Sequence, residues 1–222
     1  MFGSLKSLFG RREETAAKGH PPGPFGLGVG LAVRVDLMKL AVARTQLAMP
    51  PMPETLIVTG HGISDMGGGT LLHRYYADDH RMLQVVAEGG TGPEAVREVM
   101  MFQPWDSVVP QSEREWAEWD GPSGRIGARR FEADGFAFDR HWGDPSEARI
   151  DPVEFVETVA LDEGGPRRIH QKVVSYRRPI PSLDDEFETL LIAVERDLDA
   201  GERGSVSFMI GYDVGQADVS PV

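Results

Sequence analysis

The run "SVSFMIGYDV" near the C-terminus (residues 205–214) restricts the possible folds more than any other part of the chain. Its large apolar side chains fall on alternate positions, at Val206, Phe208, Ile210 and Tyr212. A period of two places these side chains on one face of a β-strand, because successive residues of a strand point to opposite sides. We therefore expect residues 204–212 to form a strand, with Phe208 and Ile210 in the core.

Three further strand-like runs precede it. "VEFVETVAL" (residues 153–161) and "RIHQKVVSYRR" (residues 168–178) flank the turn "DEGGP", and "EFETLLIAVE" (residues 186–195) is followed by the turn "RDLDAGERG". Two such runs around a glycine-containing turn are typical of an antiparallel hairpin. The pattern therefore predicts two antiparallel hairpins within residues 153–212.

Two more hairpins are expected in the middle of the chain. Residues 70–88 contain two strand-like runs joined around residues 77–80. Asp134 and Gly135 lie between two aromatic-bearing runs, and an Asp-Gly pair favours a tight hairpin turn because both residues accept positive φ. Strands therefore dominate most of the sequence.

Helices are expected at a few places. Residues 37–47 have apolar side chains near one face, and "MPPMP" ends this segment because proline cannot continue a helical hydrogen-bond ladder. Capping-box patterns, Thr91 with Glu94 and Ser112 with Glu115, indicate two more helix starts. The sequence thus predicts an α+β fold: a mainly antiparallel, meandering sheet with a few short helices and a flexible N-terminal tail.

The chain is expected to have three parts: an amphipathic N-terminal segment at residues 1–12, a linker at residues 13–26, and a single α+β domain at residues 27–222. The linker, "EETAAKGHPPGPFG", is polar and rich in proline and glycine. Such a composition does not bury enough apolar surface to order itself. We therefore expect folded structure to begin near Leu27.

Charge and cysteine content exclude several classes of function. The formal net charge is −12 at pH 7, so phosphate backbones repel the chain and we expect no nucleic-acid partner. The chain contains no cysteine, which excludes disulfides, thiolate nucleophiles and cysteine-ligated metal clusters. No apolar run approaches the ~20 residues that a membrane-spanning helix needs. We therefore expect a cytoplasmic protein.

Histidines and carboxylates supply a candidate polar site. His73 and His80 flank Asp78 and Asp79 across a predicted turn, but this spacing fixes no metal geometry. Aspartate also favours turns because its side chain bonds nearby backbone amides. We therefore expect no cofactor and no tight transition-metal site. A ligand-binding or catalytic site would have to be assembled from distant polar residues, for which the candidates are His73, Asp78, Asp79, His141 and Glu157.

The N-terminal segment, "MFGSLKSLFGRR", is amphipathic at helical spacing. Its apolar side chains fall on an arc of roughly 120°, and its bases suit anionic lipid. Twelve residues form only a marginal helix in water, so an inert tail, a peripheral membrane contact and docking into a partner protein all stay open. The residues of this candidate contact are Phe2, Leu5, Lys6, Leu8, Phe9, Arg11 and Arg12.

Four stretches occur in an order that resembles a known family: "LLHRYYADDHRMLQV", "FVETV", "SYRRPIPSLDDEFETLLIAVE" and "VSFMIGYDV". From about Leu27 to the C-terminus, the chain resembles the YjfK-like proteins, an uncharacterised bacterial family with a domain of unknown function. Genes of this family tend to lie beside those of a phage-shock-A-like coiled-coil protein, small membrane proteins and an enzyme similar to glutathionylspermidine synthases. The resemblance implies an association with bacterial envelope stress by gene neighbourhood alone, and it transfers no catalytic or binding residue.

The expected function is therefore that of a non-enzymatic adaptor, cytoplasmic or peripheral at the inner membrane. The resemblance implies a phage-shock-A-like coiled-coil protein as its partner. One alternative is a small-ligand-binding or enzymatic domain, and another is a structural subunit that oligomerises through an edge strand. A concave pocket that gathers polar residues would favour the ligand-binding alternative.

Overall fold

The computed structural model describes residues 20–51, 54–162, 164–200 and 202–222. Within these residues the chain forms twelve strands. Eight of them build a barrel: β2 (Thr55–Gly67), β3 (Thr70–Ala77), β4 (Met82–Glu88), β5 (Val96–Val108), β8 (Val153–Leu161), β9 (Arg167–Pro179), β10 (Phe187–Asp197) and β11 (Glu202–Asp213).

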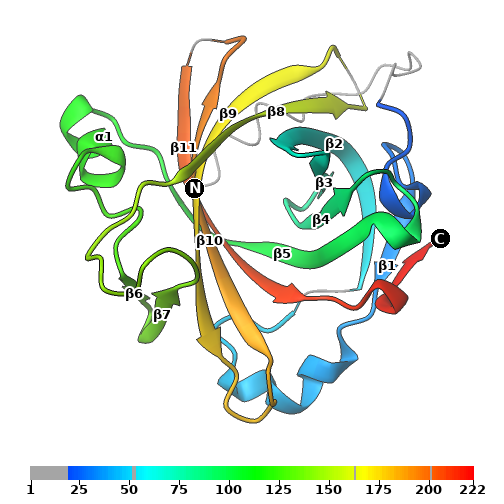
Figure 1. The fold of residues 1–222 in the computed structure, drawn as a ribbon, viewed down its shortest axis with the longest axis horizontal. Coiled ribbons are helices and arrows are strands. Elements are labelled where there is room, and N and C mark those ends of the chain that lie inside the picture. Colours follow the sequence, from blue (N-terminus) through cyan, green and yellow to red (C-terminus); the bar gives the residue numbers. More distant parts are fainter. Residues whose placement is uncertain (1–19, 52–53, 163, 201) are drawn as a thin grey trace.

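The barrel is antiparallel and closed. Its strands follow the order β2-β3-β4-β5-β11-β10-β9-β8, and β8 then pairs with β2 to complete the circle. The closing register places Gly60 opposite Leu161 and Gly62 opposite Val159. Figure 1 shows the strands around one interior, with β8 and β9 crossing the top of the view. Closure matters for the site because it gives every one of these strands an inward and an outward face.

The other elements lie outside the barrel. They are β1 (Ala32–Val35), β6 (Arg130–Ala133), β7 (Phe136–Arg140), β12 (Val219–Pro221), the α-helix α1 (Glu113–Asp120) and the short 3-10 segments Pro24–Gly26, Met38–Gln46, Pro93–Ala95 and Gln216–Asp218. Strands β1 and β12 extend the sheet beside β2, and β6 and β7 extend it beside β9. In Figure 1, α1, β6 and β7 lie together on the left of the barrel.

These outer elements cover the main hydrophobic core. Leu40 of the 3-10 segment and Val33 of β1 pack in one cluster with Tyr75 and Val85, which are outward residues of β3 and β4. A second, smaller cluster contains inward residues such as Met82 and is separate from the first. Both faces of the barrel strands are therefore buried. The outer face packs against the apolar side chains of the outer elements, and the inner face lines the barrel interior.

The expected α+β fold is wrong, because the described part of the chain is mainly β and closes into a barrel. The helix expected to start at Thr91 is a single 3-10 turn, Pro93–Ala95, followed directly by strand β5. Strand β5 pairs with β4 on one side and β11 on the other. This pairing on both edges outweighs the local capping-box pattern, since tertiary context overrides weak local preference.

Several local predictions based on turns and caps are confirmed. Strands β8 and β9 form an antiparallel hairpin, as do β10 and β11, and Phe208 and Ile210 are buried. Asp134 and Gly135, at φ 52° and 79°, turn the chain between β6 and β7. The Ser112 hydroxyl accepts a hydrogen bond from the Glu115 amide at 3.2 Å and caps α1.

The N-terminal predictions fall mostly outside the described residues. This applies to residues 1–12 and to the first part of the predicted linker, so the membrane or partner contact stays a prediction. Residues 20–26, also assigned to the linker, lie against the barrel, where the Tyr75 hydroxyl donates to the Pro24 carbonyl at 3.1 Å. In the described part of the chain, no helix is long and apolar enough to cross a membrane.

Candidate functional site

Charged side chains project into the barrel. Arg74 and Tyr76 leave β3 on the same face, because they lie two residues apart, and Glu157 of β8 reaches both of them. Gly62 of β2 lies opposite Arg74. A Cβ atom at Gly62 would stand 1.7 Å from Glu157 Oε1. Glycine at this position therefore leaves the space that the Glu157 carboxylate occupies.

Glu157 and Arg74 form a buried ion pair within a hydrogen-bond network. Arg74 Nη1 donates to Glu157 Oε2 at 3.3 Å, and the two side chains are 4% and 1% exposed. Tyr76 Oη donates to Glu157 Oε1 at 2.8 Å. Gln171 Nε2 donates to Glu157 Oε2 at 3.2 Å, and Arg74 Nε donates to Gln84 Oε1 at 3.1 Å. These bonds offset the cost of burying the charges, which an ion pair alone offsets poorly.

Glu195 of β10 brings a second carboxylate to this network. Gln171 Nε2 donates to Glu195 Oε1 at 3.3 Å, so one amide group bridges the two acids. Burial raises the pKa of Glu195 to about 7; the hydrogen bond from Gln171 opposes this rise and the Glu157 carboxylate adds to it. Near neutral pH, Glu195 is therefore present in both its protonated and its ionised form. When it is ionised, the network of Arg74, Glu157 and Glu195 carries one excess negative charge.

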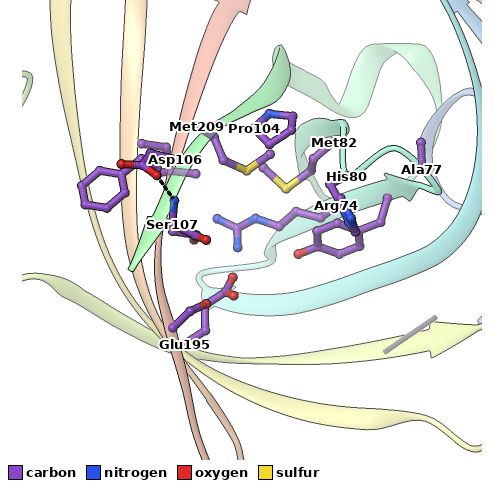
Figure 2. A pocket seen from close by; sticks show the side chains of 14 residues that line it. Arg74, Ala77, His80, Met82, Pro104, Asp106, Ser107, Glu195 and Met209 are labelled. Atoms are coloured by element: carbon purple, nitrogen blue, oxygen red, sulfur yellow. Dashed lines mark hydrogen bonds between the residues drawn. The ribbon is translucent and has the colours of Figure 1, made fainter. Parts of the chain in front are cut away.

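A cavity of ≈ 40 Å³ lies beside this network. A buried water needs roughly 10–15 Å³ of such space, so the cavity has room for about three waters. Its apolar wall includes Met82, Leu191 and Met209, and its polar wall includes Arg74 and Glu195. Figure 2 shows the Arg74 guanidinium, the two methionine side chains and the Glu195 carboxylate directed toward one space. The walls thus combine charge with flexible apolar surface.

A separate histidine cluster lies on the outer face of the same strands. His61 Nε2 and His73 Nδ1 are 3.1 Å apart, and the His61 ring stacks on Tyr75 with centroids at 4.5 Å. His20 approaches the His61 ring edge-on at 5.5 Å. Burial, with the neighbouring histidines, lowers the pKa of His61 to about 3 and that of His73 to about 4. Both rings are therefore neutral near pH 7.

The residues expected to form a polar site occupy different places. His73 lies in the outer histidine cluster, whereas Glu157 lies inside the barrel. Asp78 and Asp79 lie in the turn between β3 and β4, where Asp79 Oδ2 accepts from Arg81 Nε at 2.6 Å. His141 follows β7, and its amide donates to the Ser175 carbonyl. The structure therefore does not bring these five residues together.

The residues predicted from the sequence did not include Arg74, Tyr76, Gln171 and Glu195. The sequence "HRYY" contains one signal of an interior polar site. Each face of this predicted strand carries one polar and one aromatic residue, so a polar side chain has to be buried whichever face points to the core. The alternate glycines Gly60 and Gly62 also indicated a close approach within a strand. Among the residues that the structure describes, no group of three histidine, aspartate or glutamate side chains is placed to hold a metal ion.

Comparisons with known proteins place the chain in a family. A family model described as "Protein of unknown function (DUF2491)" matches residues 4–220. The uncharacterized protein YjfK of Escherichia coli (strain K12) is 24% identical over 203 residues, which is 91% of this chain and 90% of that protein. No solved structure matches. Because the match spans nearly the whole sequence, the chain belongs to the DUF2491 family of proteins of unknown function.

Proposed function

We propose that this protein binds a small molecule inside its barrel. The observation that carries the proposal is the buried Arg74–Glu157 pair beside a cavity that Glu195 also lines. An eight-stranded barrel is just wide enough for side chains to fill or for one small ligand to enter. Apolar residues would fill such a barrel at lower cost, because burying ions removes their hydration. Charged groups that converge on a cavity are typical of a binding site.

The cavity wall supports the same proposal. Met82 and Met209 are unbranched side chains with several rotatable bonds, and they lie on one wall of the cavity. Methionine adapts its shape to irregular neighbours. A ligand somewhat larger than three waters therefore fits if these two side chains change rotamer, while the strands hold the polar groups in place.

The adaptor role is a separate proposal. It depends on residues 1–12 and on a phage-shock-A-like partner that the family resemblance implies, and the described residues do not test it. A small-molecule site inside the barrel is compatible with such a role, since ligand binding leaves the outer surface accessible. The two proposals need separate experiments.

Ligand-observed NMR with a library of small fragments tests the binding proposal. Ser207 lines the cavity, so Ser207→Leu fills part of it. Ser220 lies exposed on β12, and Ser220→Leu is the matched control. We expect fragments that bind the wild type to lose at least tenfold in affinity with Ser207→Leu and to bind Ser220→Leu unchanged. Absence of binding, or binding that Ser207→Leu does not weaken, contradicts the proposal, provided that circular dichroism shows both variants folded.

A further inference from the structure

The network leaves hydrogen-bond acceptors with spare capacity. Arg74 donates to Glu157 and Gln84, and the Tyr76 hydroxyl donates to Glu157. The Gln171 amide nitrogen donates to both Glu157 and Glu195. Gln171 Oε1 and the Glu195 carboxylate keep acceptor capacity, whereas the remaining N–H groups of Arg74 belong to a charge that Glu157 already balances.

Gln171 provides an independent sign of a missing donor. Its side-chain oxygen, Oε1, is buried and has no hydrogen-bond partner among the described residues. Gln171 is 1% exposed. A buried amide oxygen without a donor is unfavourable, because it has lost the hydrogen bonds to water that it makes in the unfolded chain. Turning the amide over does not relieve this cost, because the oxygen would then face the carboxylates of Glu157 and Glu195.

Glu195 is the second group with acceptor capacity left over. Within the described part of the chain, its recorded hydrogen bond comes from Gln171, at 3.3 Å. No ion pair of Glu195 with Lys or Arg occurs among the described residues, whereas Glu157 has Arg74 as a partner. The cavity that Glu195 lines has an apolar wall of Met82, Leu191 and Met209.

We propose that the ligand of this barrel is a small organic cation, an alkylammonium, whose charged nitrogen pairs with Glu195 and whose hydrocarbon part packs on the methionine wall. This inference rests on the proposed binding function. An ammonium group brings hydrogen-bond donors and no acceptor, which suits the spare acceptor capacity of Gln171 and Glu195. It also supplies the positive charge that balances Arg74, Glu157 and Glu195.

An anionic ligand fits this site less well. Its natural partner would be Arg74, but the positive charge of that guanidinium is already paired with the Glu157 carboxylate. An anion would also enter beside two carboxylates, Glu157 and Glu195. Like charges at close range in a poorly hydrated site repel one another strongly. A neutral alcohol would avoid repulsion but would leave the excess charge unbalanced.

Three probes of similar size test the inference: n-butylammonium, 1-butanol and n-butyrate, titrated separately into the full-length protein and followed by NMR. We expect n-butylammonium to bind at least tenfold more tightly than 1-butanol, and n-butyrate to bind most weakly. Glu195→Gln keeps the shape and the hydrogen bond from Gln171 but removes the charge. It should weaken n-butylammonium at least tenfold and change 1-butanol less than threefold. The control is Glu132→Gln, at a side chain that is 71% exposed.

The outcomes separate this inference from the proposed function. Tighter binding of n-butyrate, or no effect of Glu195→Gln, overturns the cation inference. If neutral or anionic fragments still bind and Ser207→Leu weakens their binding, the barrel remains a binding site and only the cation inference is refuted. If Ser207→Leu weakens the binding of no compound, both the proposed function and the cation inference are refuted.

A second measurement needs only the wild-type protein and guards against misfolding of Glu195→Gln. Binding of a cation should ionise Glu195, whose pKa is about 7 in the unliganded barrel. Binding enthalpies measured by calorimetry at pH 7 in phosphate and in Hepes, two buffers that differ in ionisation enthalpy, should then reveal release of about half a proton per bound n-butylammonium. At pH 9 this release should fall to zero. Other charged or titratable groups near the site are Arg74, Tyr76, Glu157, His80 and Asp106. Binding of n-butylammonium without proton release at pH 7 contradicts the inference.

Discussion

Acidification should destabilise the fold through His61 and His73. The two rings are 1% and 2% exposed, and burial holds their pKa values at about 3 and about 4. An unfolded histidine titrates near pH 6.5. Below that pH the unfolded chain binds protons that the folded chain does not, so stability is complete above about pH 6.5 and is lost as the pH falls toward the folded pKa values.

The magnitude follows from the linkage relation. Each histidine contributes a slope of about 1.4 kcal/mol per pH unit once the pH is well below 6.5. Between pH 7 and pH 5 the two rings together remove about 4 kcal/mol, which is a large share of the 5–15 kcal/mol typical of a folded domain. Glu195 acts in the opposite direction, because its pKa is raised to about 7: its contribution is present below pH 4.5 and lost as the pH rises through 7.

Urea unfolding of the wild type and of the double variant His61→Gln with His73→Gln, at pH 7 and pH 5, separates these effects. Glu195 is present in both proteins, so it cancels in the comparison. We expect the loss of unfolding free energy on acidification to be about 4 kcal/mol smaller in the double variant, with each single variant near half of this difference. Equal pH dependence in the wild type and the double variant would refute the reasoning.

Three further predictions concern the buried pair, the helix cap and the N-terminus. Glu157→Ala leaves Arg74 buried without its partner and should cost about 3–5 kcal/mol in urea unfolding, whereas Glu132→Ala, at an exposed pair, should cost less than about 1 kcal/mol; equal losses would contradict this. Ser112→Ala removes the cap of α1 and should cost about 1 kcal/mol, which thermal unfolding measures; no loss would show that the cap is not stabilising. Wild-type protein should co-sediment with anionic vesicles at low salt, and Leu5→Asp with Leu8→Asp should abolish this by placing charge on the apolar arc. If wild type, double variant and a 13–222 truncation sediment equally, residues 1–12 are not the anchor.

The hairpins could be predicted because their signals are local. Asp134-Gly135 sets a turn between neighbouring strands, and the alternation from Val206 to Tyr212 assigns one face to the core. Barrel closure could not be predicted in the same way. It depends on pairing between Gly60 and Leu161, about a hundred residues apart in the chain, and alternation within a strand does not identify a distant partner.

The interior site was hidden for a related reason. In an open sheet, Arg74, Glu157 and Glu195 would face solvent, which is the usual position of charged residues. Only closure turns that face inward and brings the three side chains into one network beside the cavity. The helix that was wrongly predicted at Thr91 shows that a local pattern can also mislead. The capping-box spacing is present there, but the residues that follow pair with a neighbouring strand on both edges as strand β5.

Methyl NMR of protein labelled with ¹³C at its methionine methyl groups tests the central claim most directly. Met82 and Met209 line the cavity, whereas Met38 and Met66 do not line it and are 69% and 40% exposed. On titration with the fragment most sensitive to Ser207→Leu, we expect the methyl signals of Met82 and Met209 to shift in a saturable manner while that of Met38 stays fixed. Shifts confined to Met38 and Met66, or no saturable shift at Met82 and Met209, would show that the barrel interior is not the binding site.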